Sequence, residues 1–339
     1  MSHDLYAGLP LDRREAVRAA VKDAFGAAPT ALAPVGGGFS GALTYRLEVA
    51  DRPYLLRLET ARDFFRDTRR GFACMQAAAD AGVAPPLRHL DPDLRIAIMD
   101  FLPQRPLASH PGGPGGLAID LGKLIARVQA TPPFPPLADY GLILTGMSSQ
   151  LAGSGLFAAG LLAPHLEGLA MIREAYPWDA APLVSSHNDP NPRNILFDGT
   201  RLWLVDWELA FRNDPLTDVA ILANEFSATP ETEDLLLEGW LGHAADRMTK
   251  ARLTLMRQLT RMFYAGIILS RFAAAPPTRP DDDLSAPTPD EFRAAIAEGR
   301  LSPATPQTAY IYGKMYLAGF VATLSAPAFQ AALDVVRWG

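Results

Sequence analysis

Three side chains suited to phosphoryl transfer lie within one short stretch of the chain, SHNDPNPRNILFDGTRLWLVDWE. Asp189 and Asn194 are five residues apart in a proline-containing loop, and Asp206 follows further along. A carboxylate can accept the proton of an attacking hydroxyl, while a second carboxylate and an amide oxygen can hold magnesium against nucleotide phosphates. The spacing therefore predicts Asp189 as the catalytic base and Asn194 and Asp206 as metal ligands.

A predicted hairpin explains how these side chains could meet. Two apolar segments, 195–197 and 202–205, flank Asp198 and Gly199, a pair typical of a tight turn between strands. The turn would bring Asp206 back beside Asn194. His187 could itself act as a base, but we expect it to be buried and to support the loop. The alternative is that these Asp and Asn residues only cap turns.

A glycine pattern near the N-terminus, VGGGFSGA, places Gly36, Gly38 and Gly41 at G-x-G-x-x-G spacing, with Ser40 before the last of them. The pattern is shared by dinucleotide-binding turns and by loops that cover phosphates in kinases. A dinucleotide site needs a helix after the third glycine. Residues 43–49 instead alternate in polarity like a strand. We therefore expect a hairpin turn over nucleotide phosphates; a merely flexible hairpin is the alternative.

The next predicted strand, YLLRLE, carries Arg57. A guanidinium has a fixed charge and a planar shape that suits phosphate oxygens, so we expect Arg57 to bind the nucleotide phosphates. A surface arginine on a strand is the alternative. No G-x-x-x-x-G-K-[ST] pattern occurs in the sequence, which argues against a Walker-type nucleotide site.

The elements that would position these residues change in type along the chain. The first part predicts an amphipathic helix, two strands, a second helix and two more strands, over 11–25, 43–49, 54–58, 62–81, 87–90 and 95–99. After a flexible segment at 110–116, we predict helices over 117–130 and 148–176, a strand and hairpin over 183–205, and four or five helices from 215 onward. Residues 276–289 should form a loop. The pattern predicts an α+β fold with a strand-rich domain, 1–103, and a helix-rich domain, 104–339.

Composition narrows the classes of function. The 339 residues carry a net charge of −6, with 49% in the apolar class, which is typical of a globular protein and argues against nucleic acid as the main partner. The single cysteine, Cys74, leaves no internal disulfide, no secretory signal is evident, and the longest apolar runs are shorter than a membrane span. We expect a cytoplasmic protein without a nucleic-acid or membrane partner; the sequence leaves the oligomeric state open.

The motif HNDPNPRN followed by VDWE resembles the choline kinase and aminoglycoside phosphotransferase superfamily, whose members are similar to protein kinases. The glycine pattern, LLRLE, MDFLP, the catalytic segment and NDPLTDVA occur in the family's order over about residues 30–226. The resemblance implies a bilobal protein-kinase-like fold that uses ATP and Mg²⁺. It also implies that Met99, Asp100 and Leu102 bind the nucleotide and that Asp218 supports the catalytic loop.

Within the superfamily the sequence looks most like choline and ethanolamine kinases, which implies an amino alcohol as the favoured acceptor. The resemblance assigns Asn191, Glu208, Glu225 and Tyr264 to acceptor binding, and the two glutamates would attract a cation. The alternative for both glutamates is that they are solvated carboxylates on a helix face and do not bind the acceptor. The competing functions are an aminoglycoside or sugar phosphotransferase, a nucleotide-binding pseudokinase, and an enzyme that transfers a nucleotidyl group to a protein.

The sequence departs from the family's pattern at two places. No glutamate occurs between Thr60 and Leu166, so the helix expected to supply a carboxylate to Arg57 lacks one, and Asp67 is the candidate substitute. Recognition of a quaternary ammonium group calls for an aromatic cage. The segment QLTRMFYAGIILSRF offers two rings but no tryptophan, and three tyrosines further on are additional candidates: Phe263, Tyr264, Tyr310, Tyr312 and Tyr316.

Overall fold

The computed structural model describes residues 5–36, 42–303 and 305–339, and the chain divides into two compact units. The first unit runs to Leu137 and also contains Leu183–Asp218 and Glu225–Ala244. The second unit contains Ala138–Pro182, Val219–Asn224 and Ala245–Gly339. The N-terminal sheet and the catalytic segment thus belong to the same unit. The functional division into a nucleotide lobe, 1–103, and an acceptor lobe, 104–339, stays a prediction.

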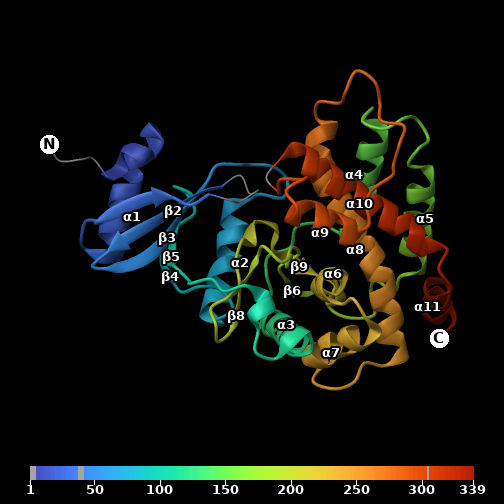
Figure 1. Cartoon of the computed structure of the whole chain (residues 1–339). Helices are drawn as coiled ribbons and strands as arrows, with labels where there is room; N and C mark the ends of the chain where they lie inside the picture. Colours follow the sequence, from blue (N-terminus) through green and yellow to red (C-terminus); the bar gives the residue numbers. More distant parts are fainter. Residues whose placement is uncertain (1–4, 37–41, 304) are drawn as a thin grey trace. The chain divides into compact units, whose positions relative to one another are not determined.

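An antiparallel sheet opens the first unit, and its described strands follow the order β1-β2-β3-β5-β4. Their bounds are Ala31–Pro34, Ala42–Val49, Arg52–Glu59, Ile96–Asp100 and Leu87–Asp91 in that order. The amphipathic helix α1 (Arg14–Phe25) packs on one face of the sheet (Figure 1). Alternate residues of β3, namely Tyr54, Leu56 and Leu58, enter this core, so Arg57 and Glu59 project from the opposite face.

Helix α2 (Thr68–Asp80) begins later than the sequence predicts. The predicted helix over 62–81 is wrong in its first turns, because Asp63 accepts hydrogen bonds from the backbone N–H groups of Phe65 and Arg66 and folds residues 63–66 into a turn. Asp67 then caps the helix by accepting a bond from the Arg70 N–H.

Two short antiparallel pairs carry the catalytic segment: β7 (Ile195–Phe197) with β8 (Leu202–Leu204), and β6 (Val184–Ser186) with β9 (Phe211–Asn213). The predicted hairpin at Asp198 and Gly199 is confirmed by this pairing. A short 3₁₀ helix, η4 (Trp207–Leu209), follows β8, and the helix α6 (Leu216–Phe226) follows β9.

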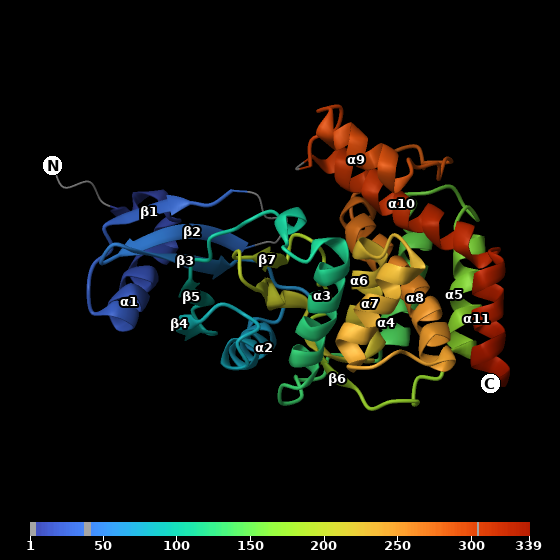
Figure 2. The same cartoon turned by 60° about the horizontal axis from the view of Figure 1, so that its bottom comes forward.

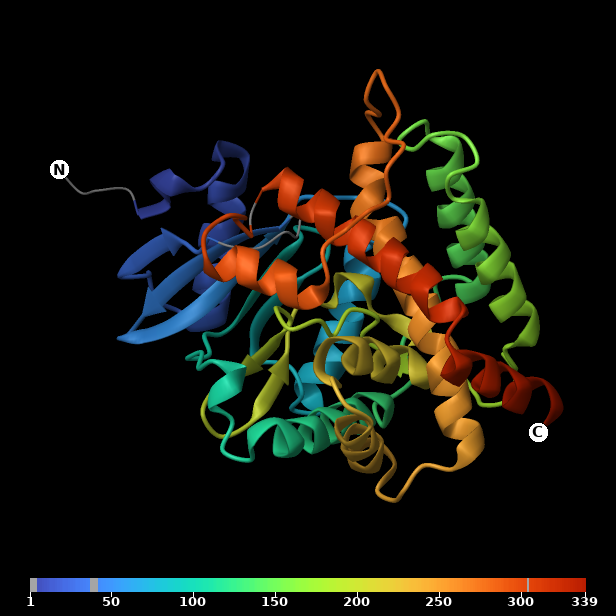
Figure 3. The same cartoon turned by 45° about the vertical axis from the view of Figure 1, so that its right-hand side comes forward.

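Helices α3 (Gly113–Gln129) and α7 (Pro230–Leu241) lie side by side in the first unit (Figures 1 and 3). Glycines allow the two helices to approach closely. A Cβ atom at Gly122 would overlap the Leu236 carbonyl oxygen, and a Cβ atom at Gly239 would overlap the Ile119 carbonyl oxygen. The prediction of a flexible segment over 110–116 is wrong for its second half. Pro114 fits the first turn of a helix, where its missing N–H has no intrahelical partner, so α3 already begins at Gly113.

The second unit is helical. Its long helix α8 (Arg247–Ala273) packs against α4 (Tyr140–Gly153), α10 (Pro306–Leu324) and α11 (Pro327–Trp338), with α5 (Ala163–Ala175) beside them (Figure 2). The helix α9 (Pro289–Ala297) follows the loop expected at 276–289. The described part of the chain contains six helices from 215 onward, α6 to α11, rather than four or five.

The single helix predicted over 148–176 is two helices, α4 and α5. Gly155 and Gly160 between them have φ angles of 78° and 80°, a left-handed conformation that ends the first helix. No described helix is by itself long and apolar enough to cross a membrane; α10 and α11 reach that length only as a pair bent by 71°.

Candidate active site

The carboxylate of Asp189 is held from both sides by amide groups of its own loop. Asn194 Nδ2 donates to Asp189 Oδ2 and to its backbone oxygen, each at 2.9 Å. Asn191 Nδ2 donates to Oδ1 at 2.7 Å, and its own Oδ1 accepts from the Arg193 N–H. Because both oxygens of Asp189 accept hydrogen bonds, the side chain has a fixed orientation. Asn191 thus supports Asp189, and its contact with an acceptor stays a prediction.

The hairpin returns the chain to this loop as the sequence predicts. The backbone N–H of Val205 donates to the Asn194 carbonyl oxygen at 3.0 Å, so Asp206 follows directly after a residue paired with Asn194. Asp206 has φ 70° and ψ 69°, a left-handed conformation that is unusual for aspartate. Such backbone strain is concentrated at functional sites, where the surrounding structure enforces it.

Asp218 and His187 hold the start of the loop that carries Asp189. The fully buried Asp218 accepts hydrogen bonds from the backbone N–H groups of His187 and Asn188, at 2.8 and 2.7 Å. Burial raises the pKa of Asp218 to about 6, although these two bonds oppose the shift. Burial lowers the pKa of His187 to about 4, so its ring is neutral near pH 7.

Both ring nitrogens of His187 contact the backbone. Nε2 lies 3.0 Å from the Val205 carbonyl oxygen, and Nδ1 accepts from the Asp189 N–H at 3.3 Å. A histidine held in this way connects the catalytic loop to the strand before Asp206. The His187 side chain is fully buried, and its supporting role, rather than that of a base, stays a prediction.

Asn188 is a supporting residue that the sequence analysis missed. Its φ is 61°, and its buried side chain donates to the carbonyl oxygens of Leu209 and Phe211 at 3.1 and 3.0 Å. Its Oδ1 accepts from Asn213 Nδ2 at 2.8 Å. Asparagine tolerates the left-handed conformation better than most residues. An asparagine between His187 and Asp189 could therefore have indicated, from the sequence, a left-handed residue that supports the loop.

Arg57 lies among three carboxylates. Its Nε is 2.5 Å from Glu59 Oε1, and its Nη2 is 2.7 Å from Asp206 Oδ1 and 3.7 Å from Glu208 Oε2. Burial alone would lower the pKa of this guanidinium, but Asp206 and Glu59 outweigh that effect and raise it above its ordinary value. Arg57 is therefore a permanent cation that links strand β3 to Asp206.

Asp67 does not act as the substitute carboxylate for Arg57 that the sequence suggested. Its side chain caps α2, and the carboxylates on Arg57 come from Glu59, Asp206 and Glu208. A capping residue at the first turn satisfies backbone N–H groups of its own helix. The sequence analysis overlooked Glu59, although residues two apart on a strand share a face.

Glu208 carries an oxygen that has no hydrogen-bond partner among the described residues. Its Oε1 accepts from Arg66 Nε at 3.1 Å, whereas the buried Oε2 has only Arg57 Nη2 nearby, at 3.7 Å, too far for a hydrogen bond. Burial, and next the charge of Asp206, raise the pKa of Glu208 to about 7. A buried oxygen in this state is suited to an additional cation or a proton donor.

The donor set near Asp206 fits a magnesium ion. Asn194 Nδ2 is engaged by Asp189, and no described residue donates to its Oδ1, so that oxygen remains for a cation. The described residues contain no group of three or more His, Cys, Asp or Glu that could hold a metal. Magnesium is commonly bound by one or two carboxylates together with substrate phosphates, so Asp206 and Asn194 would suffice.

The residues expected at the nucleotide lie on and around the sheet. Met99 is buried in β5, and Asp100 at its end receives two hydrogen bonds from Arg88, at 2.7 and 2.8 Å. Leu102, just beyond, is partly exposed, and Gly36 is exposed. Gly38, Ser40 and Gly41 lie outside the described residues. Their roles, like those of the other nucleotide-side residues, stay predictions.

Tyr264 belongs to a group of aromatic rings in the second unit, here called the ring cluster, formed by Tyr264, Phe292, Tyr312 and Tyr316. Tyr264 stacks on Tyr316 with ring centroids 5.2 Å apart, and Tyr312 stacks on Phe292 at 5.6 Å. The hydroxyls of Tyr312 and Tyr316 are 2.8 Å apart. Tyr310 instead donates to Asp281 Oδ2.

Glu225, in the last turn of α6, is partly buried.

Comparisons with known proteins identify the family of the chain. The model of the phosphotransferase enzyme family matches residues 31–254. The fold is similar to a choline/ethanolamine kinase family protein from Mesorhizobium loti, with a TM-score of 0.69, 21% identity and coverage of 96% of this chain and 99% of that one. It is also similar to the choline kinase LicA from Streptococcus pneumoniae, with a TM-score of 0.63, 12% identity and coverage of 91% and 99%.

A more distant likeness links the chain to an antibiotic-modifying enzyme, the spectinomycin phosphotransferase, with a TM-score of 0.57, 11% identity and coverage of 95% and 97%. Among curated relatives, Protein LicA of Haemophilus influenzae is 44% identical over 52 residues, which are 15% of this chain and 20% of that protein. The match thus spans about a fifth of that relative's length. The chain belongs to the phosphotransferase enzyme family and has the protein-kinase-like fold of choline/ethanolamine kinases and aminoglycoside phosphotransferases.

Proposed function

We propose that this phosphotransferase moves the γ-phosphoryl group of ATP to the hydroxyl of a small acceptor, with an amino alcohol of the choline or ethanolamine class favoured. The observation that carries the proposal is the fixed Asp189 carboxylate, held by Asn194 at 2.9 Å on a loop to which the hairpin returns Asp206. A base with a fixed orientation and two oxygen ligands beside it is what phosphoryl transfer to a hydroxyl requires.

Each residue has a defined task in this proposal. Asp189 accepts the proton of the attacking hydroxyl, so that the hydroxyl oxygen can bond to the γ-phosphorus while the bond to the leaving ADP oxygen breaks. Asn194 and Asp206 would hold Mg²⁺, which would supply charge neutralisation at the phosphate oxygens. Arg57 binds the phosphates with its permanent charge, and the glycine segment Gly36 to Gly41 covers them.

A nucleotide donor is supported by what solved relatives contain. The spectinomycin phosphotransferase was solved with ADP, a LicA protein with AMP, and an aminoglycoside 2'-phosphotransferase with GDP. These are properties of those proteins, and their folds match this chain. ATP is our choice of donor here, and Met99, Asp100 and Leu102 are its proposed contacts at the end of β5.

A cationic acceptor is supported by an acidic side chain. Glu208, whose buried Oε2 has no hydrogen-bond partner among the described residues, can attract an ammonium group. We propose Asn191, Glu225 and Tyr264 as further acceptor contacts. An aminoglycoside or sugar acceptor is the second candidate, because the fold also matches the spectinomycin phosphotransferase.

The proposal is tested by a nucleotide-consumption screen with Mg²⁺ and ATP against alcohols, amino alcohols, sugars and aminoglycosides. Asp189→Ala is the blank, and its thermal unfolding checks that it is folded. We expect consumption to depend on an amino alcohol and to vanish in the blank. Preference for a polycationic sugar would move the acceptor to the second candidate. The absence of transfer to every acceptor would refute the proposed function.

A further inference from the structure

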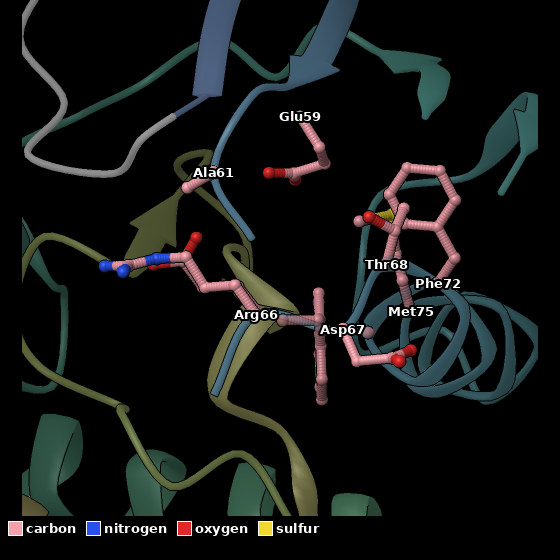
Figure 4. Close-up of a pocket in the computed structure, with 10 residues that line it drawn as sticks. Glu59, Ala61, Arg66, Asp67, Thr68, Phe72 and Met75 are labelled. Carbon is pink, nitrogen blue, oxygen red and sulfur yellow. The ribbon is translucent and has the colours of Figure 1, made fainter. Parts of the chain in front are cut away.

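The helix beside Arg57 cannot supply the carboxylate that holds this cation. Four residues of α2 line the small pocket between the helix and η4, namely Thr68, Gly71, Phe72 and Met75, and none is acidic (Figure 4). At Gly71, even a Cβ atom would lie 3.3 Å from the Trp207 carbonyl oxygen. The close approach of α2 to η4 therefore leaves no space for a long acidic side chain at this turn of the helix.

The acid nearest the start of α2 is committed to the helix itself. Asp67 Oδ1 accepts the Arg70 N–H at 2.8 Å. Figure 4 shows the Asp67 side chain beside the helix, whereas the Glu59 side chain lies on the other side of the pocket, where the strand ends. Asp67 thus completes a helix terminus and leaves Arg57 to other carboxylates.

Glu59 is placed for this task by the strand that carries Arg57. The two residues are two positions apart on β3, so their side chains leave the same face. The Glu59 backbone is paired with Ala42 of β2, and its N–H donates to the Arg95 carbonyl oxygen at 3.1 Å. Glu59 is only 8% exposed, and its Oε1 lies 2.5 Å from Arg57 Nε.

The two ends of the Arg57 guanidinium have different partners. Nε is taken by Glu59, and Nη2 contacts Asp206, a residue that must also bind magnesium in the proposed reaction. For Nη1, no acceptor occurs among the described residues. If Asp206 bound a metal, the Glu59 hydrogen bond to Nε would still fix the plane of the guanidinium, and Glu208 Oε2, 3.7 Å from Nη2, is too far for a hydrogen bond, so the Nη atoms would be available for phosphate oxygens.

We propose that Glu59 is a positioning residue that holds Arg57 for the nucleotide phosphates, in place of a carboxylate from helix α2. The inference rests on the proposed function, because it assumes a phosphate ligand for Arg57. The carboxylate comes from the same strand as its arginine, so the pair is built by one element and does not depend on the position of α2.

The test measures the affinity of the full chain for ATP and for adenosine, with Mg²⁺ and without acceptor, by calorimetry. Adenosine lacks phosphates, so damage to the fold weakens both ligands, whereas a misplaced Arg57 weakens only ATP. We expect Glu59→Gln to lower the ratio of ATP to adenosine affinity about tenfold, the range lost with one charge-assisted hydrogen bond. Glu59→Asp, which keeps the charge on a shorter side chain, should recover part of the loss.

Asp67→Asn is the matched control, since it also removes a carboxylate at the pocket while asparagine still caps a helix. It should bind both ligands like the wild type. In an Arg57→Ala background, Glu59→Gln should cause no further loss, because Glu59 acts through Arg57. An unchanged ratio in Glu59→Gln, an equal loss in Asp67→Asn, or a full additional loss in the Arg57→Ala background would overturn the inference.

The same measurement separates this inference from the proposed function. A wild-type protein that binds neither nucleotide nor adenosine contradicts the proposed function and, with it, the role of Glu59. A wild-type protein that binds ATP tightly while Glu59→Gln binds it equally well contradicts only the role of Glu59. Should Glu59→Gln fail to fold, the ratio measured for Glu59→Asp decides in the same way, with an unchanged ratio as the contradicting result.

Discussion

The catalytic segment and the ring cluster are built in different ways. In the catalytic segment, short polar side chains on a tight loop and hairpin contact one another and the backbone, as Asp189 and Asn194 do at 2.9 Å. In the ring cluster, aromatic side chains from α8, α9 and α10 pack face to face, as Tyr264 and Tyr316 do at 5.2 Å. Charged catalytic groups need positions fixed by the local backbone. The ring cluster, our proposed acceptor contact, is instead assembled from separate helices by side-chain packing.

The largest effect is expected at the charged end of this comparison. Asp189→Asn removes the proton acceptor while keeping the size of the side chain and one acceptor oxygen. We expect the turnover number to fall about 10³-fold, within the range for loss of a general base, and the affinity for ATP to stay within a few-fold of wild type. Steady-state kinetics and calorimetry check both numbers. Turnover within tenfold of wild type would exclude Asp189 as the base.

A pH effect on stability should follow from the buried His187. Its pKa is about 4 in the folded protein, against 6.5 ordinarily, so below pH 6.5 the unfolded chain takes up a proton that the folded chain excludes. His187 therefore removes stability as the pH falls from 6.5 towards 4, on the order of 2 kcal/mol between pH 7 and pH 4.5.

His187→Gln isolates this contribution, because glutamine can still donate to the Val205 carbonyl oxygen. Urea unfolding at pH 7 and pH 4.5 should show that the variant loses about 2 kcal/mol less on acidification than the wild type. Asp218, whose raised pKa acts in the opposite direction between about pH 4 and 6, is present in both proteins and cancels. Equal losses in the two proteins would mean that His187 is protonated in the folded state.

A smaller effect is expected in the ring cluster. Tyr264→Leu removes a ring that stacks on Tyr316, and we expect the KM for a cationic amino alcohol to rise five- to tenfold with little change in the KM for ATP. Tyr264→Phe keeps the ring and loses only the hydroxyl, so its acceptor KM should stay within twofold. If both variants behave alike, or if the KM for ATP rises as much as that for the acceptor, the ring cluster is not the cation site.

The parts of the structure that sequence could predict are those set by short-range rules. The hairpin between β7 and β8 follows from the turn-forming Asp198 and Gly199 between two apolar segments. The strand pair 43–49 and 54–58 follows from alternation on either side of a turn, which lies at residues 50–51 in the structure. The convergence of Asp189 and Asn194 is likewise local to one loop. Element ends were less predictable. Asp63 folds a turn where a helix was expected, and Gly155 and Gly160 divide a helix that periodicity alone made continuous.

The misassigned partner of Arg57 shows a different limit. Asp67 was the candidate substitute for the glutamate missing from the expected helix, but in the structure it lies just before the helix and satisfies the backbone of that helix rather than another side chain. Glu59 could have been found from the two-residue period of a strand. The ring cluster could be predicted only in part. Tyr264, Tyr312 and Tyr316 were candidates from the sequence, whereas the pairing of Tyr312 with Phe292 depends on how α9 packs on α10.

The central claim is that the catalytic segment transfers the γ-phosphoryl group to a hydroxyl with Asp189 as base. The most direct measurement follows labelled γ-phosphate from ATP with the best acceptor from the substrate screen, in the wild type and in Asp189→Asn. We predict that the label appears in the acceptor with one ADP formed per transfer and that Asp189→Asn lowers the rate of this transfer about 10³-fold. Release of AMP, label or nucleotide bound to protein, or undiminished transfer by Asp189→Asn would contradict the account.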